Sequence, residues 1–252
     1  MDDYKRHLAR TLAETGALFF ADDLILKDGR PTPYFVNMAM FRTGRLCMEL
    51  GNVFAEMMVS KDLVKDTDII LGPSYKGSAI ALATSIALWK GYGYDLPFEY
   101  DRKEAKTHGE ATGAKMMFVN NTFYDGCRVF VVDDVATSMG TKYELLEKIE
   151  AARKSMGIRI RVTGIGIAVD REQTTAVYDE QGNVIQGMKG KNAVLDFVDK
   201  SGVPVHTVAG IREVVGYLYD ERVPVLINGK KTPIDDVIRA RFDGYIKTYG
   251  IG

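Results

Sequence analysis

Apolar residues recur at helical spacing at the start of the chain and then settle into alternating strands and helices. A first apolar stripe, four residues apart, predicts an amphipathic helix that ends near Gly16. Two short extended segments should follow, at about 18–26 and 34–36, joined by a stretch rich in turn-forming residues. Thr43 is a suitable cap for a second helix with one apolar side.

From residue 68 onward the pattern repeats as strand, loop and helix. Strands are predicted at 68–71, 96–100, 128–132, 162–169 and 203–208, with helices at 78–90, 142–154, 192–200 and 211–219. The strand at 128–132 is almost wholly apolar, as expected for a strand buried on both faces. Strands that alternate with helices predict an α/β fold with a central, mostly parallel sheet flanked by helices.

The remaining segments do not interrupt this organisation. Residues 174–190 are expected to form a hairpin insertion that turns at 181–183. The tail from residue 223 predicts a strand, a turn and a terminal helix. No internal repeat, low-complexity tract or linker is visible in the sequence, so one domain spanning 1–252 is expected.

Composition and charge exclude several classes of protein. Hydrophobic residues make up 46% of the 252 positions and charged residues 27%, as in ordinary globular proteins. The formal net charge of -1 gives no global reason to expect nucleic acid or an anionic membrane as a partner. Cys47 and Cys127 are far apart and lack a metal-ligand pattern. The first residues form no apolar signal core, and the apolar run at 80–89 is too short to span a bilayer, so a cytoplasmic location is expected.

The most informative segment follows the strand at 128–132. Two adjacent carboxylates, Asp133 and Asp134, lead into a loop of small and hydroxyl-bearing residues that opens a helix: Val135, Ala136, Thr137, Ser138, Met139, Gly140 and Thr141. Ligands of open α/β sheets lie at the carboxyl ends of the strands, and backbone N–H groups at a helix N-terminus favour a phosphate. The two acids suit ribose hydroxyls or the steering of magnesium, although acids at a strand end can also be plain capping or solvated groups.

Two further loops carry positive charge. Tyr75 and Lys76 follow the first sheet strand in a turn that contains Gly and Pro. There Lys76 could present its charge to an anion, or it could be an ordinary surface lysine. The third loop has no apolar periodicity and holds four potentially cationic groups within seven residues: Arg102, Lys103, Lys106 and His108. Its composition alone indicates a solvated charged loop.

Five segments, in the same order, resemble those of the orotate phosphoribosyltransferases, which are type I phosphoribosyltransferases. The run VVDDVATSMGT resembles the family's ribose-phosphate signature, GPSYKG its pyrophosphate loop, and RKEAKTHGE its catalytic loop. The segment LKDGRPTPYF and the arginine of VDRE resemble the family's contacts to the base. Met139 departs from the signature, which usually has glycine there, so its side chain must point away from the phosphate.

The resemblance implies a type I phosphoribosyltransferase-like fold with a small N-terminal hood of about residues 1–40. It implies transfer of the phosphoribosyl group of phosphoribosyl pyrophosphate to orotate, which gives orotidine 5′-monophosphate and pyrophosphate in pyrimidine biosynthesis. The implied catalytic residues are Lys27, Arg102, Lys103, Lys106 and His108. Phosphoribosyl pyrophosphate would be bound by Tyr75, Lys76 and the run from Asp133 to Thr141, and orotate by Lys27, Tyr34, Phe35, Thr137 and Arg171.

The resemblance also implies Mg²⁺ as cofactor, bound through phosphoribosyl pyrophosphate, with Asp133 and Asp134 contributing at most through water. It further implies a homodimer with shared active sites. Two alternatives stay open: a phosphoribosyltransferase for another base, and a regulator that binds phosphoribosyl pyrophosphate without turnover. Lys27, Arg171 and the loop at 102–110 favour a carboxylated pyrimidine. Lys27, Lys103 and His108 argue against the regulator, and Met139 is the only feature that favours it.

Overall fold

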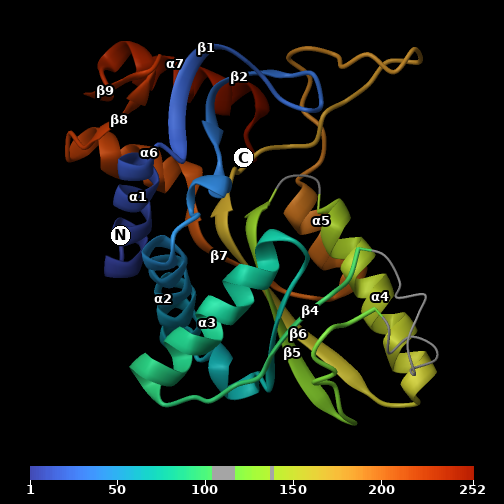
Figure 1. The fold of residues 1–252 in the computed structure, drawn as a ribbon. Coiled ribbons are helices and arrows are strands. Elements are labelled where there is room, and N and C mark those ends of the chain that lie inside the picture. Colours follow the sequence, from blue (N-terminus) through green and yellow to red (C-terminus); the bar gives the residue numbers. More distant parts are fainter. Residues whose placement is uncertain (104–116, 137–138) are drawn as a thin grey trace.

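The computed structural model describes residues 1–103, 117–136 and 139–252 (Figure 1). Their strands form one sheet of five strands and one of four. Helices cover both faces of the larger sheet, and the smaller sheet stands over one end of it (Figure 1). The helices of the described part are α1 (Asp3–Thr15), α2 (Gly44–Ser60), α3 (Lys76–Tyr92), α4 (Gly140–Met156), α5 (Ala193–Ser201), α6 (Ile211–Asp220) and α7 (Asp236–Tyr249), with short 3-10 turns η1 (Met38–Met40) and η2 (Leu63–Asp66).

All neighbouring strands of the larger sheet run parallel, in the order β4-β3-β5-β6-β7. Their bounds are β3 (Ile69–Gly72), β4 (Phe98–Tyr100), β5 (Cys127–Ala136), β6 (Ile160–Asp170) and β7 (Val205–Gly210). This arrangement confirms the predicted α/β fold with a central parallel sheet. Because the strands are parallel, their carboxyl ends meet at one edge, and the segments that follow them gather there.

Strand β5 continues beyond the limit predicted from the sequence. The apolar pattern predicts a strand that ends before the two acids, but pairing with β6 continues through Asp133, opposite Ile167, to Ala136, opposite Asp170. The prediction was wrong because it relied on apolar residues, whereas backbone hydrogen bonds to a neighbouring strand hold polar residues extended as well. The two carboxylates therefore stand on a strand and not in a loop.

Alternate residues of β5 face opposite layers of helices. Phe130 and Val132 belong to the core cluster that contains the buried residues of α2 and α3. Val129 and Val131 belong to the cluster that contains those of α4 and α5. This alternation is the two-residue period of a strand with both faces buried, and it explains why the segment is apolar throughout.

The smaller sheet takes its strands from both ends of the chain. Its order is β2-β1-β8-β9, with bounds β1 (Leu18–Ile25), β2 (Pro31–Val36), β8 (Pro224–Ile227) and β9 (Lys230–Pro233). Strands β1 and β2 are antiparallel, whereas β8 joins β1 in parallel, with Phe19 opposite Leu226. The C-terminal strands thus complete the sheet that the N-terminal strands begin.

The predicted first helix is confirmed, since α1 ends at Gly16 in the left-handed conformation, with a φ of 69°.

Residues 174–190 fold back on themselves around Gly182. An isolated antiparallel bridge joins Tyr178 to Val184 across the fold. The segment reaches the turn between β1 and β2, where the side-chain amide of Gln186 donates to the carbonyl oxygen of Gly29 at 3.3 Å. A segment that follows β6 of the central sheet thus contacts the β1–β2 turn of the smaller sheet.

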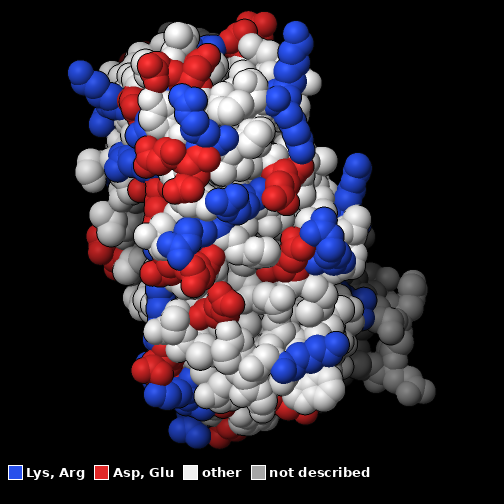
Figure 2. All heavy atoms as spheres, turned by 90° about the vertical axis from the view of Figure 1, so that its left-hand side faces the viewer, with Lys and Arg blue, Asp and Glu red and all other residues white. Residues whose placement is uncertain are grey.

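Neither a membrane-spanning helix nor a patch of one charge sign is seen in the part of the chain and on the face described next. Among the described residues, no helix has both the length and the apolar character needed to cross a bilayer. On the face shown in Figure 2, Lys and Arg are interspersed with Asp and Glu and do not gather into a patch of one sign. This mixed face agrees with the net charge of -1, so groups that bind an anion are expected in a local cluster, at the carboxyl edge of the central sheet.

Candidate active site

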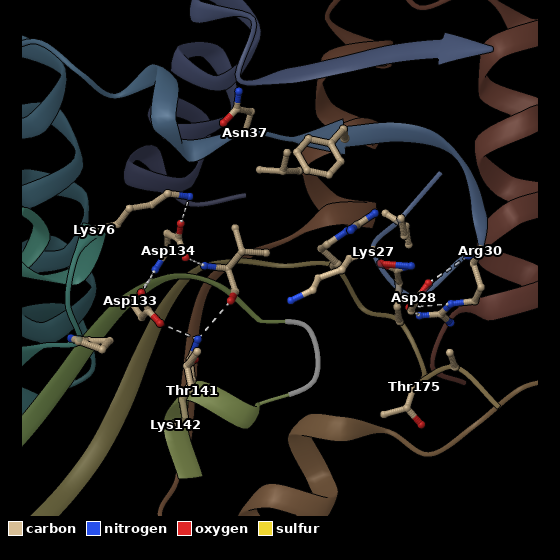
Figure 3. A pocket seen from close by; sticks show the side chains of 18 of the residues that line it. Lys27, Asp28, Arg30, Asn37, Lys76, Asp133, Asp134, Thr141, Lys142 and Thr175 are labelled. Atoms are coloured by element: carbon tan, nitrogen blue, oxygen red, sulfur yellow. Dashed lines mark hydrogen bonds and ion pairs between the residues drawn. The ribbon is translucent and has the colours of Figure 1, made fainter. Parts of the chain in front are cut away.

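One cavity of about 870 Å³ lies where the carboxyl edge of the central sheet meets the smaller sheet (Figure 3). Its walls come from the β1–β2 turn, the segments after β3 and β6, the end of β5 and the first turn of α4. Nine residues predicted from the sequence line it: Lys27, Phe35, Tyr75, Lys76, Asp133, Asp134, Val135, Thr141 and Arg171. Segments far apart in the sequence thus share one site.

Asp133 forms a buried ion pair near the end of β5. Its Oδ2 atom lies 2.6 Å from the Nζ atom of Lys142, and the two side chains are 9% and 4% exposed. The Lys142 ammonium group also donates to the carbonyl oxygen of Val135 at 3.3 Å. Burial raises the pKa of the Asp133 carboxyl group, and the positive charge of Lys142 opposes this shift without cancelling it. The pair holds the Asp133 carboxylate at the cavity wall (Figure 3).

Lys142 is a cavity residue that the sequence analysis missed. The sequence pattern places it at the start of a helix and assigns it no role, yet it lines the cavity beside Asp133. One signal could have identified it. Helix α4 begins at Gly140, so Lys142 lies in the first turn, where a cation opposes the positive end of the helix dipole. A lysine at such a position needs a carboxylate nearby.

Asp134 pairs with a lysine that follows a different strand. Its Oδ2 atom lies 2.9 Å from the Nζ atom of Lys76, the first residue of α3. The Lys76 side chain is 55% exposed, so this ion pair is open to solvent, unlike the pair at Asp133. The Oδ1 atom of Asp134 accepts a hydrogen bond from the Val135 backbone N–H at 2.8 Å. An acid and a lysine from two parallel strand ends thus meet at one wall.

Met139 adopts a backbone conformation that favours glycine. Its φ of 60° and ψ of 4°, directly before α4, lie in the left-handed region, which costs a residue with a side chain about 1–2 kcal/mol. Its side chain is buried in the core cluster that also contains Leu145 and Phe197. The methionine therefore points away from the cavity, as the resemblance required. Ala136 is likewise buried in this cluster, and Gly140 is the first residue of α4.

The other end of the cavity contains Arg171, directly after β6. Its guanidinium carbon lies 5.0 Å from the centre of the Tyr34 ring and 5.9 Å from that of the Phe35 ring. The side chain is buried, and its Nε and Nη2 atoms have no hydrogen-bond partner among the described residues. Buried guanidinium N–H groups are rarely left unpaired, and their planar arrangement suits a carboxylate. An acceptor from a ligand is therefore expected here.

Tyr34 lies beneath Arg171 and does not reach the cavity surface. It is fully buried, and burial raises the pKa of its hydroxyl group. The hydroxyl group donates to the carbonyl oxygen of Arg171 at 3.4 Å, and the ring packs against Phe242 of α7. Phe35, the next residue of the strand, faces the opposite side and lines the cavity. Tyr34 therefore supports Arg171, whereas Phe35 can contact a ligand.

The charged segment after β4 adjoins the cavity at its first residues. The Lys103 Nζ atom lies 5.9 Å from the centre of the Tyr75 ring, which is 78% exposed. Asp101 accepts a hydrogen bond from the Ser74 backbone N–H at 2.6 Å, which ties this segment to the turn before α3. Arg102 is not among the residues that line the cavity. Lys106, His108, Thr137 and Ser138 lie outside the described residues.

The chain is similar to known proteins over almost its whole length. It is 34% identical over 250 residues to the orotate phosphoribosyltransferase of Clostridium botulinum strain Alaska E43, and the match covers 99% of each chain. The chain belongs to the orotate phosphoribosyltransferase family. Proteins of the same name from Clostridium acetobutylicum and Methylococcus capsulatus are 31% and 36% identical, over 100% and 78% of this chain and 100% and 80% of theirs. No family model matches the chain.

Solved structures of orotate phosphoribosyltransferases share the fold. The protein from Francisella tularensis matches with a TM-score of 0.69 at 24% identity, over 94% of this chain and 96% of the other. The protein from Aeropyrum pernix matches with a TM-score of 0.57 at 23% identity, over 84% and 97%. These comparisons confirm the family and the type I phosphoribosyltransferase-like fold expected from the five sequence segments.

Four of the five segments that resemble orotate phosphoribosyltransferases line the same cavity, at Lys27, Lys76, Asp134 and Arg171. The fifth adjoins it where Lys103 approaches the Tyr75 ring. The arrangement can hold a polyanion at one end and a planar carboxylate at the other.

Proposed function

We propose that this protein is an enzyme, an orotate phosphoribosyltransferase. It transfers the phosphoribosyl group of phosphoribosyl pyrophosphate to orotate, which yields orotidine 5′-monophosphate and pyrophosphate in the biosynthesis of UMP. One observation carries the proposal: Lys76, Asp134 and Arg171, from three strand ends, line one cavity of about 870 Å³. That volume is within the range of small-molecule sites and suits two substrates bound side by side. Family membership supports the same activity.

Phosphoribosyl pyrophosphate fits the end of the cavity at β5. Lys76 and Tyr75 would contact the pyrophosphate group, and the Asp133 and Asp134 carboxylates would accept hydrogen bonds from the ribose hydroxyls. The 5′-phosphate would lie at the N-terminus of α4, where backbone N–H groups and the positive end of the helix dipole favour an anion. The proposed contacts here are Val135, Ala136, Thr137, Ser138, Gly140 and Thr141, together with the backbone of Met139, whose side chain points away from the cavity.

Orotate fits the end of the cavity at Arg171. The unpaired Nε and Nη2 groups of Arg171 would donate to its carboxylate, and Phe35 would contact its flat ring. Lys27 would approach from the turn above, and Thr137 is a further proposed contact. Uracil, adenine and guanine have no carboxylate, so they would leave a buried cation unpaired. Orotate is therefore the base that this site supports best.

The reaction in this site is a displacement at the anomeric carbon. The N1 atom of orotate loses its proton and forms the new bond to this carbon, and pyrophosphate leaves with the electron pair of the broken C–O bond and can take up that proton. Positive charge develops on the ribose ring and negative charge on the leaving group, so catalysis rests on positioning and electrostatic stabilisation. Lys76 would stabilise the departing pyrophosphate, and we propose the same role for Arg102, Lys103, Lys106 and His108.

Mg²⁺ is the proposed cofactor. Magnesium prefers oxygen ligands and keeps several waters, so carboxylates and substrate phosphate oxygens suit it. Asp133 and Asp134 pair with lysines at 2.6 Å and 2.9 Å, which favours contact with the ion through water. Bound there, Mg²⁺ would neutralise charge on the pyrophosphate group. A homodimer with shared active sites and a cytoplasmic location are further proposals.

The test follows the ultraviolet absorbance of orotate after phosphoribosyl pyrophosphate and MgCl₂ are added. We expect turnover with orotate and none with uracil. Arg171→Met should raise KM for orotate by about 10–100-fold, because hydrogen bonds to a charged group contribute about 1.5–3 kcal/mol. KM for phosphoribosyl pyrophosphate should change little. Arg161→Met is the matched control, since Arg161 is exposed at the other end of the same strand.

If the folded protein left the orotate absorbance unchanged, the proposed enzymatic activity would be refuted. If that protein still bound phosphoribosyl pyrophosphate in a calorimeter, it would be the regulator considered above. Turnover of uracil or a purine in place of orotate would show that the base is wrong while the reaction type is right.

A further inference from the structure

Lys27 lines the cavity without a contact that holds its side chain in place. It is exposed on the turn between β1 and β2, and it makes no hydrogen bond or ion pair with the described residues. The position of its ammonium group therefore depends on the turn itself. Two backbone hydrogen bonds close this turn: the Leu26 N–H donates to the Arg30 carbonyl oxygen at 2.8 Å, and the Gly29 N–H donates to the Leu26 carbonyl oxygen at 2.9 Å.

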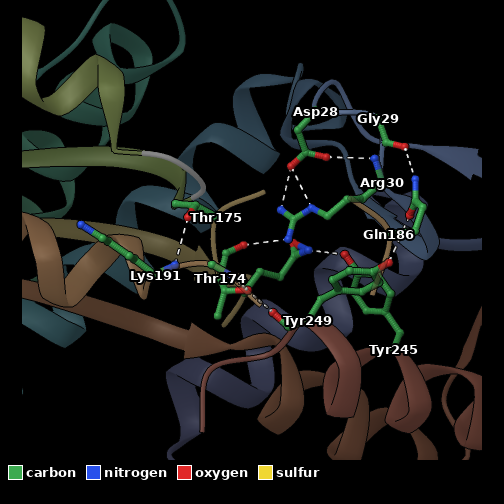
Figure 4. Close-up of polar contacts among 11 residues, drawn as sticks. Asp28, Gly29, Arg30, Thr174, Thr175, Gln186, Lys191, Tyr245 and Tyr249 are labelled. Carbon is green, nitrogen blue, oxygen red and sulfur yellow. Dashed lines mark hydrogen bonds and ion pairs between the residues drawn. The ribbon is translucent and has the colours of Figure 1, made fainter. Parts of the chain in front are cut away.

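Arg30 connects this turn to two other parts of the chain. Its side chain is buried, and its Nε and Nη2 atoms donate to the Oδ2 atom of Asp28 at 3.1 Å and 2.7 Å (Figure 4). Its Nη1 atom donates to the carbonyl oxygen of Thr174 at 2.8 Å. Its guanidinium carbon lies 5.4 Å from the centre of the Tyr249 ring. One planar group thus joins the Lys27 turn to the segment after β6 and to the end of α7.

The folded-back segment at 174–190 completes this connection. The Gln186 side chain donates to the Gly29 carbonyl oxygen at 3.3 Å and accepts from the Tyr249 hydroxyl group at 3.2 Å. The Tyr249 hydroxyl oxygen accepts from the Gly187 N–H at 2.8 Å. The Tyr249 carbonyl oxygen accepts from the Thr174 N–H, also at 2.8 Å. The turn, the segment and the last residue of α7 therefore form one hydrogen-bonded unit.

The link between Arg30 and Asp28 is ionic at neutral pH. Burial raises the pKa of the Asp28 carboxyl group, but the hydrogen bonds from Arg30 outweigh burial and leave the pKa below its usual value. Both partners are therefore charged, and two N–H groups of Arg30 meet one carboxylate oxygen. Lysine cannot replace this geometry, because its single ammonium group cannot reach Asp28 and Thr174 in the same planar arrangement.

We infer that Arg30 is a positioning residue of this active site. Thr174 lies three residues after Arg171, so Arg30 sets the distance between the Lys27 turn and the strand end that carries Arg171. The inference rests on the proposed function, in which Lys27 and Arg171 hold the same orotate. It also gives the 174–190 segment a role, as a brace that keeps Lys27 over the base. A reacting pair is sensitive to such placement, since a shift of about 1 Å can cost about 100-fold in rate.

The experiment compares Arg30→Lys with Arg153→Lys. Arg153 is a matched control because it also donates through Nε and Nη2 to one carboxylate, that of Glu150, on the surface of α4. Arg30→Lys should lower kcat about tenfold and leave KM for phosphoribosyl pyrophosphate within about twofold. The control should leave both unchanged. Gln186→Leu should lower kcat by a smaller factor than Arg30→Lys. Because Gln186 is exposed, this variant should fold even if Arg30→Lys does not, so it keeps the test decisive.

The deciding measurement repeats Arg30→Lys and Gln186→Leu in a Lys27→Ala background. If Arg30 acts through Lys27, neither change will lower kcat further there. Losses that multiply in the double variants would overturn the inference and leave the proposed function intact. The inference would also be overturned if Gln186→Leu kept the wild-type kcat and Arg30→Lys lowered only the melting temperature. A folded wild-type protein without turnover would overturn both.

Discussion

Replacement of Lys142 by methionine should destabilise the protein far more than the loss of an exposed lysine. The Lys142 Nζ atom lies 2.6 Å from the Asp133 Oδ2 atom, and the side chains are only 4% and 9% exposed. Removal of one partner of a buried pair leaves the other charge uncompensated, which costs about 3–5 kcal/mol. Asp133 can relieve part of this cost by binding a proton, because burial already raises its pKa. We expect a loss of about 2–4 kcal/mol at neutral pH.

Urea unfolding followed by circular dichroism measures this loss. The series consists of Lys142→Met, Asp133→Asn and the double variant, with Lys154→Met as control. Lys154 is 71% exposed and pairs with Glu150 at 3.4 Å, so its loss should change stability by less than about 1 kcal/mol. The double variant should be more stable than Lys142→Met, because it no longer buries a lone carboxylate.

The pH dependence gives an independent check on Asp133. Burial raises the pKa of Asp133 in the folded protein above its ordinary value of 3.8. Its stabilising contribution is therefore fully present below pH 3.8 and is lost as pH rises through the raised pKa. Lys142→Met raises that pKa further, so the stability deficit of the variant should shrink on acidification. A Lys142→Met variant as stable as Lys154→Met at neutral pH, or a deficit that grows in acid, would refute the reasoning.

Two further predictions concern single positions away from this pair. At Met139, where φ is 60°, the Gly variant should be more stable than the Ala variant by about 1–2 kcal/mol in urea unfolding, the reverse of the order inside a helix. Hydrogen bonds from Arg128 hold the pKa of Asp68 below its usual value, so its stabilising contribution is present above pH 3.8 and is lost as pH falls through the lowered pKa. The wild type and Asp68→Asn should therefore differ in unfolding free energy at neutral pH and converge in acid; a difference that widens in acid would contradict this.

The elements that local signals specify were predictable from the sequence. Gly16 ends α1 in the left-handed conformation, and the Thr43 hydroxyl oxygen accepts from the Leu46 N–H at 3.3 Å as a helix cap. Such signals act within one helical turn. The parallel pairing of β1 with β8 could not be predicted in this way, because Phe19 and Leu226 are distant in sequence and nothing near either residue specifies its partner.

The residues of the candidate site fall into the same two groups: those that a local pattern specifies and those that depend on contacts between distant parts of the chain. Residues at the carboxyl ends of parallel strands converge for geometric reasons, so Lys76, Asp134 and Arg171 could be assigned to one site from their places in the pattern. The roles of Lys142 and Arg30 could not be assigned fully in this way. The place of Lys142 in the first turn of a helix signals that a carboxylate is needed but not which one, and nothing near Arg30 in the sequence signals its distant partner. Their partners, a carboxylate on β5 and a carbonyl oxygen of a distant segment, become visible only once the chain is folded.

Lys76 and Lys142 both pair with neighbouring acids of β5, yet the structure suits them to different tasks. An exposed pair such as Lys76 with Asp134 contributes only about 0–1 kcal/mol, so under the proposed function a pyrophosphate group can draw Lys76 away at little cost. The departure of Lys142 would leave Asp133 buried and unpaired, so we expect this pair to persist through the reaction. Under the proposed function, Asp134 would then be the carboxylate that substrate binding releases for a ribose hydroxyl, whereas Asp133 would stay fixed by its lysine.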